Sequence, residues 1–201
     1  MFKPEINFEV PLIPIVGDGF CFPYLVNLTV KKKVLGFLHI DMDVLDDIGN
    51  SLLQGDGKVW HLKKKKRIIR DPAGLLLLTL REKTLSWHNT WKVYRGEGSD
   101  RNDVLYTVKR SSTIQMKMQL DVFLASNING EICDFHVKGS FTNQSFKVYK
   151  GNTVIAEVKE RFKLGSFFKG REKFEVRVYP GVDYAFIVSI LIIYNEIYGE
   201  S

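Results

Sequence analysis

Hydrophobic residues recur at every second position through most of the chain before residue 180. The runs TIQMKMQLDVFL, NTVIAEVKERF and KFEVRVY alternate hydrophobic with polar side chains, which is typical of strands that bury one face. In KFEVRVY, for example, Phe174, Val176 and Val178 are expected to face inward. Turn-forming sequences such as DPAG (71–74) and KGN (150–152) separate the runs at short intervals. The pattern predicts roughly ten to twelve strands, mostly joined as a meander, and therefore an antiparallel sandwich or barrel.

The stretch VDYAFIVSILIIYNEI (182–197) breaks this alternation, because it is hydrophobic on every side. Pro180 and Gly181 end the last predicted strand, and Asp183 can cap a helix by accepting hydrogen bonds from the free backbone N–H groups that follow. As a helix, its roughly 11 hydrophobic residues span about 16 Å, which is too short for a bilayer core of about 30 Å. Its β-branched residues leave a strand as the alternative. We expect a buried helix that runs through the middle of a barrel.

The chain is predicted to form one domain over residues 21–201, because no linker or low-complexity segment divides it. Residues 1–20, which contain Pro4, Pro11 and Pro14, are expected to form a loosely held N-terminal arm. With 201 residues, 45% of them hydrophobic, the chain is long enough to bury a large core. We expect it to be a monomer.

The cysteines and the N-terminal sequence both favour an intracellular protein. Cys21 and Cys133 lie in unrelated segments without C-x-x-C spacing, which favours a reducing compartment. The first residues, MFKPEINFEVPLIP, contain acids and prolines where a secretory signal needs an unbroken hydrophobic core. We predict a cytoplasmic location, with peripheral attachment to the plasma membrane or nuclear entry as the alternatives.

The net positive charge of the chain is concentrated in one segment. The chain has 29 Lys and Arg against 23 Asp and Glu, a formal net charge of +6. The run KKKKRIIR accounts for the whole excess, through Lys63, Lys64, Lys65, Lys66, Arg67 and Arg70. A shorter run, KKK (31–33), is offset by nearby acids at Asp41, Asp43, Asp46 and Asp47. This distribution indicates a local basic patch and not a generally basic surface.

Three interpretations of the basic cluster stay open. It can attract inositol phosphates or anionic lipid, at about 1 kcal/mol per basic residue near a charged surface. It can act as a nuclear-import signal or a nucleic-acid patch, or it can simply keep a hairpin edge soluble and unpaired. Arg81, Lys83, Lys109 and Arg110 are further candidates for an anion-binding surface. Lys109 and Arg110 are neighbours in a predicted strand, so they should face opposite sides.

The residue patterns for metal binding and catalysis are incomplete. Asp41 and Asp43 have EF-hand spacing, but Leu52 stands where the closing Glu belongs. The histidines, His39, His61, His88 and His136, are scattered without paired spacing. Alternation places His136 on one strand face and Cys133 on the other. Nucleophile-elbow, Walker and dinucleotide motifs are missing from the sequence. We therefore predict a non-enzymatic protein without a metal site or a cofactor.

Several long blocks of the sequence resemble one plant protein family. They are PAGLLLLTLREKTLSWHNTWKVYRGE (72–97), DVLYTVKRSS (103–112), LDVFLA (120–125), CDFHVKGSF (133–141) and VYPGVDYAFIVSILII (178–193). From about residue 24 to about residue 198 the chain resembles the LURP-one-related family. That family is similar to the C-terminal domain of tubby-like proteins and to phospholipid scramblases. The resemblance implies a mainly β fold, a tubby-like closed antiparallel barrel of about twelve strands around a central hydrophobic C-terminal helix.

The resemblance also implies a function. One member of the family is linked to basal defence against oomycete pathogens, and tubby domains bind phosphatidylinositol bisphosphate and tether transcription regulators at the plasma membrane. By analogy of fold, the resemblance implies a binding module for phosphoinositides or anionic membrane surfaces that is linked to plant defence signalling. The alternative is a protein-interaction or transcription-associated adaptor that binds no lipid.

Overall fold

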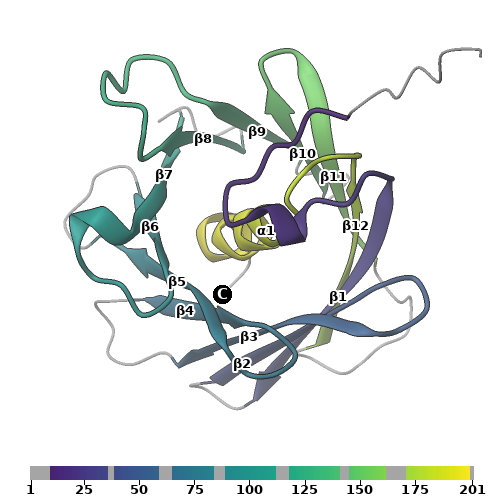
Figure 1. Cartoon of the computed structure of the whole chain (residues 1–201). Helices are drawn as coiled ribbons and strands as arrows, with labels where there is room; N and C mark the ends of the chain where they lie inside the picture. Colours follow the sequence, from purple (N-terminus) through teal and green to yellow (C-terminus); the bar gives the residue numbers. More distant parts are fainter. Residues whose placement is uncertain are drawn as a thin grey trace, which may run out of the picture.

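The computed structural model describes residues 10–35, 39–58, 65–83, 89–111, 118–140, 145–161 and 171–199. In this part of the chain, twelve antiparallel strands form a closed barrel around one α-helix (Figure 1). The strands are β1 (Val26–Leu35), β2 (His39–Leu45), β3 (Ser51–Lys58), β4 (Lys66–Arg70), β5 (Leu76–Glu82), β6 (Trp91–Arg95), β7 (Val104–Arg110), β8 (Gln119–Leu124), β9 (Phe135–Ser140), β10 (Ser145–Lys150), β11 (Thr153–Glu160) and β12 (Arg171–Val178). The helices are α1 (Tyr184–Tyr198) and two short 3-10 helices, η1 (Asp18–Phe20) and η2 (Arg101–Asp103). The predicted fold class is confirmed.

Each strand pairs with its neighbours in the sequence, and β1 closes the barrel by pairing with β12. The meander that the turn spacing predicted is therefore confirmed. The predicted alternation also holds in β12, where Phe174, Val176 and Val178 are buried in the core that surrounds α1. The closed ladder gives every described strand a hydrogen-bonded neighbour on both sides, which removes the free edges that an open sheet would have.

Helix α1 fills the barrel. All its residues from Tyr184 to Tyr194 are buried, so its uniform hydrophobicity matches a barrel wall that surrounds it on every side. The Ser189 hydroxyl donates to the Phe186 carbonyl oxygen and is hydrogen-bonded to the Tyr106 hydroxyl. Asp183 caps the helix as predicted, because its Oδ1 accepts the Phe186 N–H at 2.9 Å. Among the described helices, none is long and hydrophobic enough to cross a bilayer.

The carboxylate of Asp183 also holds the N-terminal segment across the barrel end, in front of α1 in Figure 1. Its Oδ2 accepts the backbone N–H groups of Ile15, Val16 and Gly17 at 3.1, 2.6 and 3.2 Å. Burial raises the pKa of Asp183, and its backbone N–H donors oppose that rise. The expectation of a loosely held arm is therefore wrong around residues 15–17. Residues 1–9 of the predicted arm lie outside the described residues.

The strand connections alternate between the two ends of the barrel. The connections after β2, β4, β6, β8 and β10 lie at the end where α1 begins, and all are within the described residues. Strands β1, β3, β5, β7, β9 and β11 run to the opposite end of the barrel. We call the end where α1 begins the α1 N-terminal end and the opposite end the α1 C-terminal end.

Candidate functional site

Strand β4 divides the basic cluster between the inside and the outside of the barrel. The Arg67 side chain is buried, at 4% exposure, whereas Lys66 is exposed and Arg70 is half-buried. Because successive residues of a strand point to opposite faces, Arg67 faces the interior while Lys66 and Arg70 face outward. Lys63 and Lys64, the other two predicted residues before β4, lie outside the described residues.

Arg67 fastens the last turns of α1 to the barrel wall. Its Nε donates to Oε1 of Glu196 at 2.8 Å, and its Nη2 lies 2.8 Å from the same oxygen. Lys65 adds a second contact, with its Nζ 3.3 Å from Oε2 of Glu196. Gly57 of β3 leaves room for this arrangement, because a Cβ there would lie 2.3 Å from Cδ of Arg67. Two of the predicted anion-binding residues are therefore already engaged with an internal carboxylate.

On the outer face, three basic residues stand side by side on neighbouring strands. Lys66 of β4 is directly opposite Arg81 of β5, which is directly opposite Lys92 of β6. Directly opposed residues have Cβ atoms about 4.5–5.5 Å apart, so three positive charges lie in one line across the sheet. We call Lys66, Arg81 and Lys92 the outer basic row. The sequence reasoning missed Lys92, because only the strand register places it beside Arg81.

The members of the outer basic row are poorly neutralised. Within the described residues, no carboxylate forms an ion pair with any of them. The Arg81 guanidinium lies 5.4 Å from the ring centroid of Tyr94, and its Nη2 donates to the Glu97 carbonyl oxygen at 3.3 Å. Its Nε is buried and, among the described residues, lacks a hydrogen-bond partner. Since like charges directly opposite one another destabilise a sheet, a bound anion would stabilise this row.

Lys109 and Arg110 face opposite sides of the wall, as predicted. The Lys109 ammonium lies 4.7 Å from the ring centroid of Phe123, and Lys109 is directly opposite Asp121 on the outer face. The Arg110 guanidinium lies 5.4 Å from the ring centroid of Tyr198 on α1. Lys109 therefore stands beside an acid without an ion pair to it among the described residues, and Arg110 contacts the helix.

The remaining predicted residues lie at the margins of this surface. Arg70 donates through Nη1 to the Gly74 carbonyl oxygen at 3.2 Å, towards the α1 N-terminal end. Lys83 is exposed just after β5, where its backbone N–H donates to the Thr90 carbonyl oxygen at 2.8 Å. The eight predicted residues that the structure describes therefore do not form one surface. Lys66 and Arg81 belong to the outer basic row, and the Arg67 contact is a separate, internal feature.

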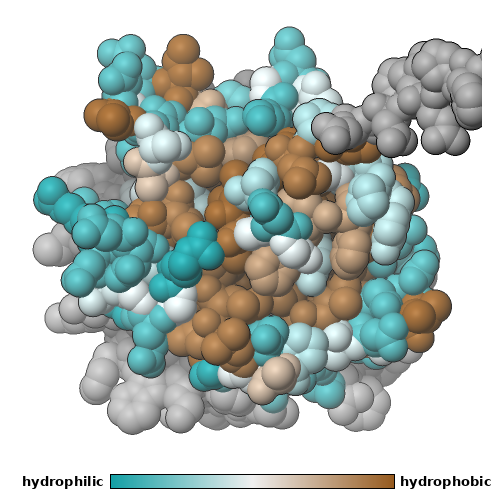
Figure 2. Space-filling model, in the orientation of Figure 1, coloured by the Kyte–Doolittle hydropathy of each residue, from teal (hydrophilic) through white to brown (hydrophobic). Residues whose placement is uncertain are grey.

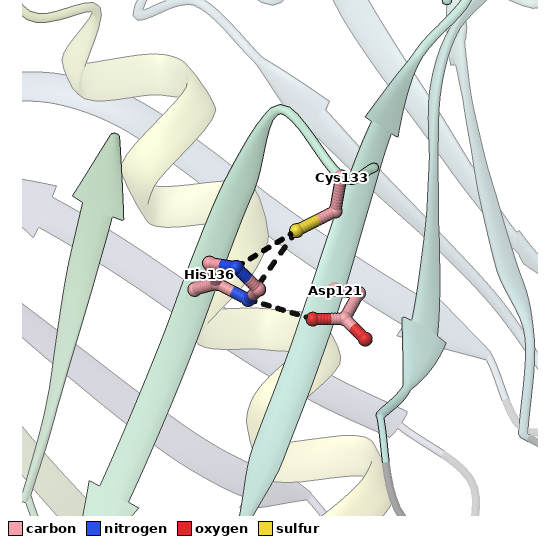
Figure 3. A group of neighbouring side chains, drawn as sticks. All are labelled: Asp121, Cys133 and His136. Carbon is pink, nitrogen blue, oxygen red and sulfur yellow. Dashed lines mark hydrogen bonds and ion pairs between the residues drawn. The ribbon is translucent and has the colours of Figure 1, made fainter. Parts of the chain in front are cut away.

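A second polar group lies on the outer face where β8 pairs with β9 (Figure 3). Asp121 and His136 are directly opposite each other, with Oδ1 and Nδ1 2.8 Å apart. The Cys133 Sγ lies 3.3 Å from Nδ1 and 3.2 Å from Nε2 of the same imidazole. The prediction that Cys133 and His136 occupy opposite faces is wrong, because β9 begins at Phe135 and strand alternation does not extend back to Cys133.

The Cys133 thiol is held in its neutral form. Burial and the neighbouring Asp121 carboxylate raise the pKa of this thiol to about 11. The thiolate is the reactive form of cysteine, so these surroundings disfavour a nucleophilic role for Cys133.

The interior of the described barrel leaves little room for a substrate. A cavity of about 20 Å³ lies beside Arg67 and Glu196, close to Lys32 and Met42, and it has room for about one water molecule. A broader hollow of about 630 Å³ lies against β1, β10, β11 and β12. Its charged residues neutralise one another, as in the ion pair of Lys147 with Glu157 at 2.7 Å.

The comparison with known proteins agrees with the fold. The family model described as LURP-one-related matches residues 26–195, and the chain belongs to this family. LURP-one-related 14 of Arabidopsis thaliana is 45% identical over 96% of this chain and 95% of its own length. Protein LURP1 of the same plant is 40% identical over 91% of this chain and 89% of its own length. A protein of Arabidopsis thaliana solved by X-ray crystallography superposes with a TM-score of 0.67 at 34% identity, covering 91% of this chain and 97% of that one.

Proposed function

We propose that this protein is a non-enzymatic binding module for phosphoinositide headgroups on anionic membranes, acting at the inner surface of the plasma membrane in plant defence signalling. The observation that carries the proposal is the outer basic row, in which Lys66, Arg81 and Lys92 are directly opposed on three neighbouring strands. Inositol phosphates present several phosphate groups close together. The spacing of neighbouring strands, about 4.7–4.9 Å, suits contacts from separate side chains to separate phosphates.

The chemistry of the row fits phosphate. The Arg81 guanidinium has a fixed fork of donors that matches phosphate oxygens. Its Nε is buried, so a phosphate would be bound through the terminal nitrogens. Each basic residue near an anionic membrane surface contributes about 1 kcal/mol of attraction. Three such residues would give useful but reversible binding, as a peripheral module requires.

The composition of the six segments between the described ranges adds to this proposal. In the gaps 36–38, 59–64, 84–88, 112–117, 141–144 and 162–170 there is no Asp or Glu. The same segments contain the lysines Lys63, Lys64, Lys117, Lys163 and Lys169, together with Trp60, Trp87 and several phenylalanines. Lysine combined with tryptophan and phenylalanine is a composition that favours the headgroup region of anionic membranes. Lys63 and Lys64 of one of these segments directly precede Lys65 and strand β4 in the chain, close in sequence to Lys66 of the outer basic row.

A binding role is preferred to an enzymatic one on the chemistry of the described residues. Helix α1 occupies the barrel interior, where the cavity beside Arg67 holds about one water molecule. The thiol of Cys133 has its pKa raised to about 11 by burial and nearby carboxylates, which disfavours nucleophilic catalysis.

Vesicle binding tests the proposal. Wild-type protein should cosediment with phosphatidylcholine vesicles that contain phosphatidylinositol bisphosphate, and less with vesicles of equal total charge that contain phosphatidylserine. The triple variant Lys66→Gln/Arg81→Gln/Lys92→Gln should bind at least tenfold more weakly, because about 1 kcal/mol is lost per charge. An unchanged circular dichroism spectrum would establish that the variant is folded. Equal binding by the two proteins would refute the role of the row.

The second candidate function, an adaptor that binds a protein and no lipid, rests on the α1 N-terminal end. Large aliphatic side chains stand exposed on its hairpins, at Ile48 (81%), Leu75 (65%), Ile128 (93%) and Ile132 (81%). Figure 2 views this end and shows hydrophobic residues across its centre. The described connections here also carry Asp46, Asp47, Asp71, Glu97, Asp100, Asp103, Glu131 and Asp134. Acidic and aliphatic residues together suit a partner with a hydrophobic, basic surface.

Two measurements separate the candidates. The adaptor function predicts that binding to vesicles is equally weak for all lipid compositions. It also predicts nuclear accumulation of a fluorescent fusion that is lost when the lysines of KKKKR are neutralised. The membrane function predicts the opposite result in the vesicle assay, with loss of binding in the outer-row variant and normal binding in an Ile128→Ser/Ile132→Ser variant.

A further inference from the structure

Outside the surface proposed for membranes, three different metal-ligating side chains converge at one point of the barrel wall. Asp121 comes from β8, His136 from β9, and Cys133 from the segment just before β9 (Figure 3). One ligand atom from each, a carboxylate oxygen, an imidazole nitrogen and a sulfur, lies within 4.8 Å of the other two. A carboxylate, an imidazole and a thiol at one point are a donor set typical of zinc sites.

The local fold holds these three residues in place. The strand register fixes Asp121 and His136 directly opposite each other. The segment that carries Cys133 is fastened by the next residue, Asp134, whose Oδ2 accepts the Leu124 N–H at 2.8 Å and the Asn127 Nδ2–H at 2.9 Å. Because the Asp134 carboxylate already accepts these two hydrogen bonds, we do not include it among the ligands. The approach of Cys133 to His136 is therefore built into the turn between β8 and β9.

We propose that Asp121, Cys133 and His136 form a binding site for a zinc-class divalent cation, with the fourth coordination position open to solvent. The ion would be held by Oδ1 of Asp121, Nδ1 of His136 and Sγ of Cys133. Zinc bonds of about 2.3 Å to sulfur and about 2.0–2.2 Å to nitrogen and oxygen require these donors to stand about 3.3–3.6 Å apart in a tetrahedron. The donors are close to this spacing, with Sγ–Nδ1 at 3.3 Å and Oδ1–Nδ1 at 2.8 Å.

Metal binding requires the His136 ring to rotate, because Sγ of Cys133 lies almost equally far from Nδ1 and Nε2, at 3.3 and 3.2 Å, and therefore faces the ring. Oδ1 and Nδ1 must separate by about half an ångström to accommodate the bond lengths. The side chains of His136 and Asp121 are 46% and 23% exposed, so they can rotate without disturbing the buried core. Three protein ligands and one solvent position are the arrangement of an accessible site, whereas purely structural zinc sites have four protein ligands.

Metal binding displaces the proton of the Cys133 thiol and the hydrogen bond between Asp121 and His136. The thiol of Cys133 loses its proton to solvent and forms the bond from sulfur to the metal. The imidazole keeps one proton, on Nε2, so that Nδ1 can coordinate, and the carboxylate of Asp121 exchanges its hydrogen bond for a metal bond. The divalent charge is then balanced by one thiolate and one carboxylate. No electron transfer occurs.

Two carboxylates lie at the site and favour a cation. Asp121 is itself a ligand, and Asp134 follows Cys133 directly in the chain. On the neighbouring strands the facing groups are Lys109 of β7 and Tyr149 of β10. Lys109 is directly opposite Asp121 with its ammonium 4.7 Å from the Phe123 ring centroid, and Tyr149 is directly opposite His136. On β9 itself, the Lys138 ammonium lies 5.0 Å from the Tyr149 ring centroid. Within the described residues, neither lysine has an ion pair to a ligand of the proposed site.

Titration of the full chain with Zn²⁺ and with Co²⁺ tests the site. Wild-type protein should bind one equivalent of Co²⁺ and develop the near-ultraviolet charge-transfer band of a cobalt–thiolate bond. Cys133→Ser should abolish the band and weaken Zn²⁺ binding at least tenfold in calorimetry, and His136→Ala should weaken it to a similar extent. Cys21→Ser is the matched control, because it removes the other cysteine, and should leave both signals unchanged.

The possible results are decisive. Failure of wild type to bind Zn²⁺, or equal affinity in wild type and Cys133→Ser, would overturn the proposal. So would a charge-transfer band that disappears in Cys21→Ser and persists in Cys133→Ser. The serine variant replaces one half-buried atom, so its folding can be verified by an unchanged melting temperature. The metal titration is independent of vesicle binding, so failure of either proposal leaves the other untouched.

Discussion

The chain contains two lysine-rich tracts, and the barrel gives them opposite surroundings. In the tract on β1, Lys31 is directly opposite Asp43 and Lys33 is directly opposite Asp41, both on β2. Lys32 points inward and pairs with Glu172 of β12 at 2.8 Å. The strand register therefore places two of the nearby acids directly beside this tract, although Lys31 and Lys33 also face Lys173 and Arg171 of β12.

The tract that leads into β4 has no such partners on its outer side. Lys66 is opposite Arg81, and Arg81 is opposite Lys92, so register joins three positive charges there. On its inner side, Arg67 bonds Glu196 of α1 at 2.8 Å. Two adjacent residues of this tract therefore have different roles. Arg67 forms an internal ion pair with α1, and Lys66 is part of the outer basic row. The comparison teaches that the cross-strand partner, and not the length of a lysine run, decides whether a basic tract is free to bind an anion.

The largest expected effect is a loss of folding stability when Arg67, the inward-facing residue of the β4 tract, is replaced. Arg67→Ala should lower the free energy of unfolding by about 3 kcal/mol, because it removes the buried partner of Glu196 and leaves that carboxylate only the partly exposed Lys65 at 3.3 Å. Lys66→Ala, one residue away on the outer face, should change it by less than about 0.5 kcal/mol. Urea denaturation measures both. Similar losses for the two variants would contradict the assignment of inner and outer faces.

A smaller loss is expected when the space for Arg67 is filled. Gly57→Ala places a Cβ 2.3 Å from Cδ of Arg67 and should cost about 1–3 kcal/mol, as overpacking does. The control is Gly19→Ala, where an added Cβ has no neighbour within 4 Å; it should be neutral within about 0.5 kcal/mol. Thermal unfolding with a matched denaturant series would detect the difference, and equal behaviour of the two alanine variants would argue against a tightly packed Arg67.

The β1 tract can be converted into an anion-binding surface by removing its acids. On its other side Lys31 is directly opposite Lys173 of β12, so Asp41→Asn/Asp43→Asn would leave several lysines unbalanced. Binding to phosphatidylserine vesicles should rise by about 1 kcal/mol per released lysine, or roughly fivefold each. Unchanged binding would mean that Asp41 and Asp43 do not neutralise this tract.

The smallest expected effect is a difference in salt dependence. Vesicle binding by the outer basic row should depend on salt more strongly than the stabilisation that comes from the Arg67–Glu196 contact. The exposed charges of the outer basic row are screened as the Debye length falls from about 10 Å at 0.1 M to about 3 Å at 1 M salt, so vesicle binding should weaken. The destabilisation caused by Arg67→Ala should change little, because the Arg67 contact with Glu196 is buried. Denaturation at two salt concentrations, beside a vesicle titration, checks the contrast.

The fold was largely predictable because its signals are local. Period-two alternation identified the strands, and the length of the hydrophobic C-terminal run together with the Asp183 cap identified a buried helix, which the structure confirms. The second role of Asp183, accepting the N–H groups of Ile15, Val16 and Gly17, joins segments far apart in the sequence. The sequence around Asp183 contains no pattern that predicts this long-range contact.

The candidate sites were only partly predictable, because they depend on register and on where strands begin. In KKKKRIIR, Ile68 and Ile69 are adjacent, so alternation alone does not tell whether Arg67 or Lys66 faces inward. The inclusion of Lys92 in the outer basic row follows from its pairing with Arg81, which the sequence does not specify. The meeting of Cys133 with His136 required knowing that β9 begins at Phe135.

The most direct test of the account compares two matched double variants in one vesicle assay. Lys66→Gln/Lys92→Gln removes two charges from the outer basic row, and Lys31→Gln/Lys33→Gln removes two charges from the β1 tract. With vesicles that contain phosphatidylinositol bisphosphate, the first variant should lose at least tenfold in affinity, since each charge contributes about 1 kcal/mol. The second should lose clearly less affinity, because Lys31 and Lys33 each face an acid on β2, Asp43 and Asp41, beside their basic neighbours on β12. Equal losses in the two variants would show that net charge alone governs binding and would contradict the account.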